Sequence, residues 1–338
     1  MIKSSTAVKA RIKNKADGDS DKSQIMLRIY LMERLLERIS KSKYRDNFVL
    51  KGGLLVSSLV GVDMRSTMDI DTTVRSLALN KENARKILEE IMAIDLEDGV
   101  EFQITKAKEI MEGHEYEGVR FMIDCHLDKL KQTIKIDIST GDEITPRAVA
   151  YKLPLIVEDR TIDLWAYNLE TLLAEKLETI MVRAEANTRM RDFYDIHVLL
   201  RYEGENIDKN ILKDAFEATC KRRKSETMIS ELRDVIDKVH NTETMNLQWN
   251  NYQRDNYYVG KITWDEVFYP QLGVKLCSMA GGGVQKIYMV LLREPSRRDR
   301  SGSDLFHLRD GFEIKMNFDR NVSCFIFVNA LMHDDFFD

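Results

Sequence analysis

The chain has 338 residues, of which 43% are hydrophobic and 32% are charged, as is typical of a soluble globular protein with a substantial core. This length allows two or three domains. The net charge of -5 argues against a protein that coats nucleic acid through its overall charge, but it leaves room for local basic patches. The four cysteines are far apart and form no CxxC pair, which argues against structural zinc and indicates a reducing compartment.

Residues 1–23 are polar and charged, and their basic residues are not followed by the apolar segment of a secretory signal. No run of the sequence approaches the ~18 apolar residues that a membrane-spanning helix needs. We therefore expect a cytoplasmic protein with no membrane partner.

The first part of the chain predicts a mixture of helices and strands. Residues 24–40 carry apolar side chains at spacings of three and four, as an amphipathic helix does. Further on, apolar runs and alternation of apolar with polar residues predict strands. The expected strands are 48–51, 62–75, 100–110, 118–127 and 131–139, with a short apolar helix after Gly52–Gly53 and a second helix over 80–94 capped by Asn80.

The second part of the chain is mainly helical, and we expect helices over 169–186, 189–204, 209–223 and 226–240. The whole order predicts an α+β fold in which a mixed sheet flanked by helices is followed by a mainly helical C-terminal domain. We divide the chain into an N-terminal helical region (1–45), an α/β core (46–165), a helical domain (166–272) and an unassigned C-terminal tail (273–338).

Gly52 and Gly53 lie between an apolar strand and an apolar helix. Two glycines at this place suit a tight turn, which needs a permissive backbone. They also suit a backbone that approaches a phosphate, because the free N–H groups at the start of a helix attract an anion. A Gly-Gly pair alone is weak evidence, so both interpretations stay open.

Asp69 and Asp71 are two residues apart in a segment that reads as a strand, so both carboxylates project from one face. Their neighbours are apolar or β-branched, and unpaired carboxylates in such a half-buried strand are costly. A divalent cation would remove that cost, and hard oxygen ligands suit magnesium. Acids at exposed strand ends are common, however, so this pair by itself does not identify a metal site.

A third acid could complete a cluster with this pair. In "TIKIDIST" three isoleucines alternate with polar residues, which leaves Asp137 on the face opposite to the isoleucines. If this strand lies beside the first one, Asp137 joins the two acids. Asp124, on the adjoining strand, is the rival for that role.

Charged residues on the helices suit either a structural or a phosphate-binding role. Lys176 and Arg183 are seven residues apart and share a helical face, which on most surface helices is a solvated basic face. Asp192 and Asp195 are three apart at the edge of an apolar face, so they are neighbours. They could form structural ion pairs with the arginines just before them. A carboxylate that steadies a triphosphate-binding lysine would give the same pattern.

Together these motifs resemble a known family. A strand with Gly-Gly, a strand with Asp-x-Asp and a third acid on a neighbouring strand are similar to the core of the nucleotidyltransferase fold of the DNA polymerase β superfamily. More narrowly, the chain resembles the AbiEii/AbiGii toxin nucleotidyltransferases of bacterial abortive-infection and toxin–antitoxin systems. The resemblance covers roughly residues 5–270 and rests on six motifs in the family's order: "YRDNFVLKGG", "MRSTMDIDTT", "YEGVRFMID", "IKIDISTGDEITP", "LETLLAEKLETIMVR" and "TRMRDFYDIHVLL".

The resemblance implies roles for individual residues. The family's catalytic positions are matched by Asp69, Asp71, Asp137, Lys176 and Asp192, of which the first three would also bind the metal. The positions that contact the nucleotide are matched by Gly52, Gly53, Arg65, Thr67, Lys176, Arg183 and Asp195. The family's K-x-D motif favours Asp137 over Asp124. Leu54 stands where many members have Thr or Ser, so one possible phosphate hydroxyl is missing.

The activity that the resemblance implies is the transfer of NMP from an NTP, with Mg²⁺ or Mn²⁺ held by the three acids and pyrophosphate leaving. Lys176 would hold the phosphates, Asp192 would orient Lys176 or the nucleotide, and Asp137 would bind a second ion or deprotonate the acceptor hydroxyl. The helical domain would complete the active site. The implied acceptor is RNA (tRNA ends for some members), and the implied partner is a cognate antitoxin.

Two alternatives stay open. The same fold could transfer NMP to a protein side chain, or hydrolyse the NTP by transfer to water. The chain could also be a module without catalysis that binds only a nucleotide or a partner, although the complete set of acids and the lysine argues against this. Label from an NTP in RNA, in protein or only in free nucleotide would distinguish these functions.

Overall fold

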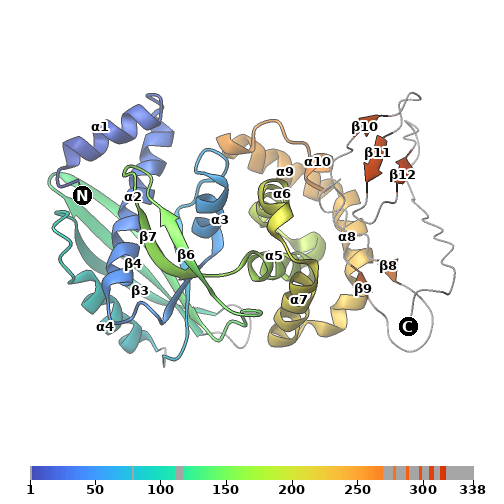
Figure 1. Cartoon of the computed structure of the whole chain (residues 1–338), viewed down its shortest axis with the longest axis horizontal. Helices are drawn as coiled ribbons and strands as arrows, with labels where there is room; N and C mark the ends of the chain where they lie inside the picture. The colour runs from blue at the N-terminus through green and yellow to red at the C-terminus, as the bar shows by residue number, and fades with distance from the viewer. Residues whose placement is uncertain are drawn as a thin grey trace.

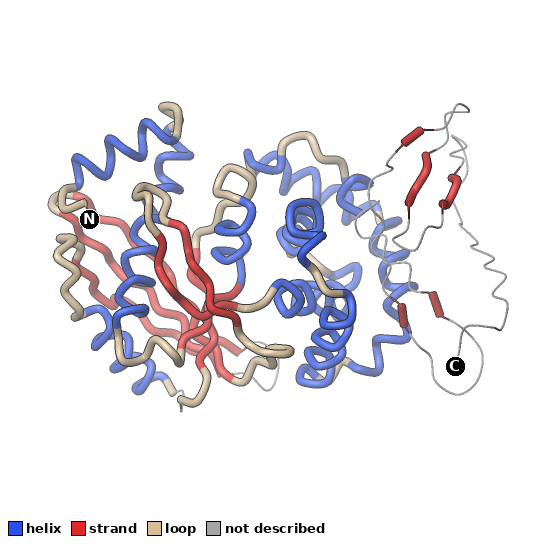
Figure 2. The backbone as a smooth tube through the Cα atoms, in the orientation of Figure 1, coloured by secondary structure: helices blue, strands red, loops and turns tan. Residues whose placement is uncertain are grey.

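A computed structural model describes residues 2–77, 80–111 and 117–268, and beyond them only the backbone of some short strands. The first part of the chain forms a seven-stranded mixed sheet with the strand order β3-β4-β5-β2-β1-β7-β6, and Figure 2 draws its strands in red. Its strands are β1 (Phe48–Lys51), β2 (Asp69–Val74), β3 (Glu101–Met111), β4 (Glu117–Leu127), β5 (Leu130–Thr140), β6 (Val149–Pro154) and β7 (Thr161–Ala166). Parallel pairs join β2 to β5 and β1 to β7, and the other neighbours are antiparallel.

Among the described residues, four helices of the first part of the chain precede the sheet strands or lie between them in sequence, and the second part is mainly helical. The helices of the first part are α1 (Ser5–Lys15), α2 (Ser20–Lys41), α3 (Gly52–Val60) and α4 (Lys81–Met92). Those of the second part are α5 (Leu169–Arg183), α6 (Met190–Glu203), α7 (Lys209–Arg223), α8 (Leu232–Asn241), α9 (Glu243–Asp255) and α10 (Trp264–Phe268), with short 3₁₀ turns η1 (Ala184–Ala186), η2 (Gly204–Asn206), η3 (Glu226–Glu231) and η4 (Tyr257–Val259). Figure 1 shows α3 between the sheet and these later helices.

The alternation in the strands decides which face of the sheet is covered. In β5, Ile134, Ile136 and Ile138 are buried, and Ile136 lies in register with the fully buried Ile70 of β2 and Phe121 of β4. Helix α2 packs on β5 and β7, and α4 packs on β3, so these helices cover the apolar face. The polar residues between the isoleucines therefore point to the other face.

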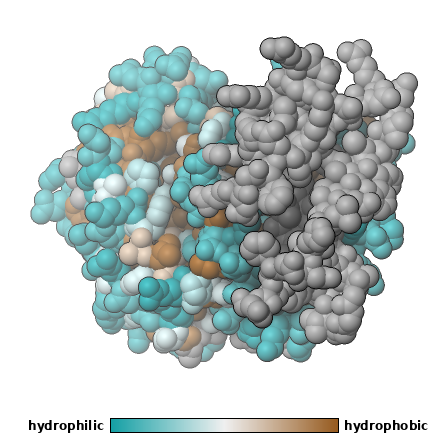
Figure 3. Space-filling view, turned by 45° about the vertical axis from the view of Figure 1, so that its right-hand side comes forward, coloured by the Kyte–Doolittle hydropathy of each residue, from teal (hydrophilic) through white to brown (hydrophobic). Residues whose placement is uncertain are grey.

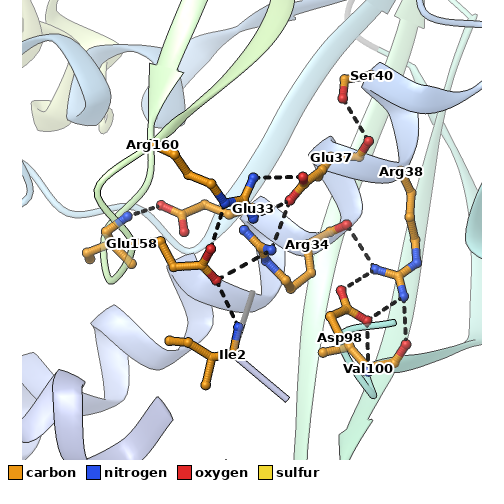
Figure 4. A network of polar contacts seen from close by, with 11 residues as sticks. Ile2, Glu33, Arg34, Glu37, Arg38, Ser40, Asp98, Val100, Glu158 and Arg160 are labelled. Atoms are coloured by element: carbon orange, nitrogen blue, oxygen red, sulfur yellow. Dashed lines mark hydrogen bonds and ion pairs between the residues drawn. The ribbon is translucent and has the colours of Figure 1, made fainter. Parts of the chain in front are cut away.

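A network of buried charges fixes α2 to the loop between β6 and β7 (Figure 4). The guanidinium of Arg160 donates two hydrogen bonds to the Glu37 carboxylate, at 2.7 and 2.9 Å, and a third to Glu158. Arg34, on the next turn of α2, lies 2.9 Å from Glu37. The backbone N–H of Ile2 donates to Glu158, so the same network holds the start of the chain.

The fold class predicted from the sequence is confirmed, with two differences in detail. Of residues 62–75, expected as one strand, only Asp69–Val74 is a strand, and the preceding residues form turns and a loop. The backbone N–H groups of Met64 and Arg65 turn back to the carbonyl oxygen of Gly61, which keeps this part out of the sheet. The hairpin of β6 and β7 was not predicted.

The domain boundaries predicted from the sequence are not tested and stay a prediction, although the last sheet strand ends at Ala166 and α5 begins at Leu169. The predicted tail 273–338 lies outside the described residues apart from the backbone of its short strands. These are β8 (Cys277–Ser278), β9 (Ile287–Tyr288), β10 (Arg297–Arg298), β11 (Asp304–His307) and β12 (Glu313–Met316).

The coloured surface in Figure 3 is mainly hydrophilic, with smaller hydrophobic areas between the polar side chains. Among the described residues, few large hydrophobic side chains are exposed, and Leu247 is the most exposed of them at 56%. Within the same residues, no helix is both long and apolar enough to cross a membrane.

Candidate active site

The three acids singled out in the sequence come from two neighbouring parallel strands. Asp71 of β2 lies in register with Asp137 of β5, and Asp69 lies in register with Lys135. Residues in register on adjacent strands point to the same face, and so do residues two apart on one strand. All three carboxylates therefore lie on the face that α2 and α4 leave uncovered. The acid of β4, Asp124, lies opposite Thr133 and binds Lys131, so it does not join this group.

Two of the three acids are paired with basic side chains of the same sheet. The ammonium of Lys135 lies 2.7 Å from Asp69. Arg120 of β4 lies opposite Asp137 and donates two hydrogen bonds to its carboxylate, at 2.8 and 2.6 Å. Such a bidentate arrangement is the strongest pairing that an arginine and a carboxylate form. The charges of Asp69 and Asp137 are thus both compensated by basic side chains of the sheet.

Asp71 lies between the other two acids and has a different environment. Burial raises the pKa of its carboxyl group, and the nearby charge of Asp137 raises it further. Lys51, in register with Asp71 on β1, and the backbone N–H of Gly53, 3.2 Å away, counteract this rise only in part. Asp71 is therefore the acid of this site that most needs an additional positive charge.

The Gly-Gly turn is shaped by the acid that it faces. Gly52 has a φ of +67°, and a Cβ atom added to it would lie 2.1 Å from Oδ2 of Asp71. A Cβ atom on Gly53 would lie 2.9 Å from Oγ1 of Thr67. Side chains at either position would collide with predicted site residues, so close approach requires both glycines, and the positive φ is a second requirement at Gly52. The start of α3 is thereby brought against the acids.

Lys51 joins the sheet to the helical part. Its ammonium lies 2.6 Å from Asp142, just after β5, and 3.8 Å from Glu175 of α5. Burial alone would lower the pKa of Lys51, but these two carboxylates outweigh it and raise the pKa above its usual value. Burial likewise opposes ionisation of Asp142, yet Lys51 lowers the pKa of that carboxyl group to about 2. Lys51 and Asp142 therefore stay charged together at neutral pH.

The helical motif residues form a second buried charge cluster next to α3. The ammonium of Lys176 lies 2.6 Å from Asp195 and 3.3 Å from Asp192, and all three side chains are buried. Asp195 also accepts a hydrogen bond of 2.5 Å from Nε of Arg65. Although burial opposes ionisation, Arg65 and Lys176 lower the pKa of Asp195. Asp192 is further paired with Arg189, at 2.8 Å, as the structural interpretation of this motif required.

The remaining residues predicted to contact the nucleotide differ in whether they lie beside the other site residues. The hydroxyl of Thr67 lies 3.4 Å from the carbonyl oxygen of Asp69 and faces Gly53, so it belongs to the group around the glycine turn. Arg183 is exposed at the last residue of α5, and within residues 2–77, 80–111 and 117–268 no hydrogen bond or ion pair joins it to the other predicted site residues. Leu54 is buried in the core, which is the packing reason for an apolar side chain there.

The chemistry of the site fits a divalent cation, although the acids are not arranged around one. Among the described residues, no group of three or more His, Cys, Asp or Glu side chains has an arrangement that could hold a metal. The reason lies in the ion pairs, since Asp69 is turned to Lys135 and Asp137 to Arg120. The carboxylate oxygens and the only partly compensated Asp71 suit a hard cation such as Mg²⁺, which would compete with Lys135 and Arg120 for Asp69 and Asp137.

Sequence reasoning missed the basic residues that neutralise the site. Lys51 directly precedes Gly52, and Arg120 lies in the quoted motif "YEGVRFMID", but neither received a role. Their positions carry no signal along a single strand, because Lys51 contacts a residue far along the chain and Arg120 pairs across the β4–β5 hairpin. The alternation within β4 and β5 could have placed Arg120 on the acid face, had the register been known.

The comparisons with known proteins agree with this geometry. The family described as "Nucleotidyl transferase AbiEii toxin, Type IV TA system" matches residues 34–268. The chain belongs to the AbiEii nucleotidyltransferase toxin family. This confirms the resemblance seen in the six motifs, and it makes the protein a nucleotidyltransferase of a type IV toxin–antitoxin family. Membership implies an NTP substrate and an antitoxin partner.

Solved structures show more distant likenesses. JHP933 from Helicobacter pylori is 14% identical, with a TM-score of 0.38 and matched regions covering 69% of this chain and 95% of that one. An antigenic nucleotidyltransferase-like protein from Paracoccidioides brasiliensis is 13% identical, with a TM-score of 0.31 and coverage of 71% and 97%. No curated protein sequence matches this chain.

Proposed function

We propose that this AbiEii-family protein transfers NMP from an NTP to RNA, and specifically to tRNA, with the help of Mg²⁺ or Mn²⁺. The observation that carries the proposal is the row formed by Asp71 and Asp137, with Asp69 on the same face and the Gly52–Gly53 turn against it. A row of carboxylates beside the N-terminus of a helix suits a cation bound to a triphosphate.

The proposed step is a displacement at the α-phosphorus of the NTP. The acceptor hydroxyl oxygen forms a bond to this phosphorus, the bond to the oxygen that bridges to the β-phosphorus breaks, and pyrophosphate leaves with that electron pair. A divalent ion bound by Asp69, Asp71 and Asp137 would offset the charge that develops on the phosphates. Asp137 is the residue proposed to accept the proton of the hydroxyl, once its carboxylate is released from Arg120.

The groups around the acids would bind and orient the nucleotide. The N–H groups at the start of α3, next to Thr67, are proposed to face the phosphates. Lys176 is proposed to bind the phosphates and Asp192 to orient it, and both already lie in one buried cluster. The contact of Asp195 with Lys176 and Arg65 supports a positioning role for that acid. For Arg183, the proposal rests on the family motif alone.

The biological setting belongs to the same proposal. RNA and NTPs meet in the cytoplasm, where we propose that the toxin acts, in defence against phage, until its antitoxin neutralises it. Transfer to protein or to water is kept as an outcome of the test below.

The test compares the native protein with Asp71→Asn in a reaction with labelled NTPs, Mg²⁺ and total tRNA. We expect label in RNA with the native protein and a loss of at least about 10²-fold with the variant, since the variant lacks a charge that the transition state requires. Label in protein bands, or only in free nucleotide, would contradict the RNA acceptor. Label transfer by Asp71→Asn at the native rate would contradict the site.

The same variant provides its own folding control. The pKa of Asp71 is raised in the folded state, so stability falls as pH rises from the ordinary range of an aspartate through the raised pKa. An asparagine at this position cannot ionise, so the stability of the variant does not fall in this way as the pH rises. We therefore expect Asp71→Asn to unfold at an equal or higher temperature than the native protein at neutral pH, with the difference vanishing at acid pH. A loss of activity in the variant would then reflect chemistry and not unfolding.

A further inference from the structure

The row of side chains that contains the acids continues to the edge of the sheet. Arg120 lies opposite Asp137 on one side and opposite Lys108 of β3 on the other. Directly opposite residues of neighbouring strands point to the same face. Lys106 lies two residues from Lys108 on the same strand and therefore points the same way. Lys106, Lys108 and Arg120, here called the basic face, thus lie on the side of the sheet that carries the acids.

The intervening residues confirm this assignment of faces. Ala107 of β3 lies opposite Phe121, which in turn lies opposite Ile136, and the last two side chains are fully buried on the helix-covered side. Lys106 and Lys108 are exposed, and the side chain of Arg120 is 40% exposed. The basic face is therefore accessible to a ligand from solvent.

The basic face and the glycine turn lie on opposite sides of the acids. In the strand order β3-β4-β5-β2-β1, the acids occupy β5 and β2, the glycine turn follows β1, and the lysines lie on β3. From Asp71 to Lys108 there are three inter-strand spacings, or about 14 Å. Phosphates bound at the glycine turn would leave the β3 side of the acids free for a second anionic molecule.

We propose that the basic face binds backbone phosphates of the RNA acceptor and guides its end to the acids. The proposal rests on the proposed function and adds the place where the acceptor lies. Lysine and arginine contacts to phosphates supply affinity without reading sequence. Arg120 links the two regions, because a cation bound by Asp137 would release its guanidinium for the nearest acceptor phosphate.

The test uses the full chain with the double substitution Lys106→Gln and Lys108→Gln. Initial rates of label transfer are measured against total tRNA concentration at several salt concentrations, with saturating NTP and Mg²⁺. We expect the KM for tRNA to rise about tenfold. The slope of log KM against log salt concentration should fall by about 1.4, since each phosphate contact to a single strand contributes about 0.7 to that slope. The KM for the NTP should not change.

Lys9→Gln with Lys13→Gln is the matched control, because these lysines are exposed on α1 and the change in net charge is the same. An unchanged KM for tRNA in the basic-face variant, or an equal rise in the control, would overturn the proposal while leaving the transferase function intact. If the native protein labels protein instead of RNA, the acceptor assignment itself fails, and this outcome is visible without any variant. Both double variants should unfold at the native temperature.

Discussion

At the scale of residues, the site is defined by which charges compensate each other. Asp69 and Asp137 each have a basic partner at 2.6–2.8 Å, whereas Asp71 has only partial compensation from Lys51 and the N–H of Gly53. A half-buried carboxylate without a full partner costs free energy that the fold must supply elsewhere. Such an unfavourable arrangement is typical of a functional site, where a ligand removes the cost.

The close approach of Gly52 to Asp71 leads to a prediction for Gly52→Ala. Alanine is strained at the φ of +67° that Gly52 adopts, so the variant should lose about 1 kcal/mol of stability. The new methyl group would also displace the Asp71 carboxylate, so we expect label transfer to RNA to be lost. Gly61→Ala is the control, because Gly61 has a φ of +95° but nothing within 4 Å of the added Cβ.

Thermal unfolding and transfer rates of both variants check this prediction. The control should lose similar stability and keep its activity. Full activity in Gly52→Ala would show that the position of Asp71 does not matter.

At the scale of elements, α6 holds the loop that precedes the first acid. The hydroxyl of Tyr194 donates to the carbonyl oxygen of Met64 at 2.5 Å, and the neighbouring Asp195 binds Arg65. From the other side, the hydroxyl of Ser57 in α3 donates to the carbonyl oxygen of Arg65 at 2.6 Å. The loop is thus fixed between two helices, which places Thr67 against the glycine turn.

We predict that Tyr194→Phe loosens this loop. The half-buried carbonyl oxygen of Met64 would lose its donor, which should cost about 1 kcal/mol of stability and lower the transfer rate. Tyr202→Phe is the control, since the exposed Tyr202 reaches only the sulfur of Met64, at 3.8 Å. Urea unfolding and transfer assays on both variants check this prediction. Equal stability and equal transfer rates in the two variants would contradict it.

At the scale of the whole molecule, buried ion pairs join the sheet to the helices. Arg223 of α7 lies 2.7 Å from Glu178 and 3.4 Å from Glu175, both on α5, and Glu175 in turn approaches Lys51. Arg222 adds a hydrogen bond of 2.6 Å to the carbonyl oxygen of Gly141, after β5. The acids of the sheet and the lysine cluster of α5 are held relative to each other by these contacts.

We predict that Arg223→Ala strongly destabilises the protein. Removing Arg223 from this largely buried charge cluster takes a basic partner away from Glu178 and leaves Glu175 with the more distant Lys51, which should cost about 3 kcal/mol. Lys213→Ala, on the same helix, breaks only an exposed pair with Glu217 and should cost less than about 0.5 kcal/mol. Denaturant unfolding of the two variants measures the difference. Equal losses would mean that Arg223 does not hold the two parts together.

Much of the fold followed from local patterns. Alternation predicted β3, β4 and β5 to within a residue or two, and the cap of α4 by Asn80 was predicted, because both depend on neighbouring residues alone. The strand expected over 62–75 was too long, since contacts to α3 and α6 keep its first half out of the sheet. The β6–β7 hairpin was missed although β7 alternates between exposed and buried residues, and it is fixed by pairing with β1 and by the charges around Arg160.

By itself, the sequence determined which residue types the site contains: three acids at strand spacing, a glycine pair and a helical lysine with two acids. Motif spacing is a local property, so it survives without a structure. The K-x-D motif already favoured Asp137 over Asp124, but only the tertiary structure showed that Asp137 lies opposite Asp71, and that Lys135 and Arg120 neutralise Asp69 and Asp137. These relations depend on strand order and register, which no local pattern encodes, and the pairing of β2 with β5 joins segments distant in the chain.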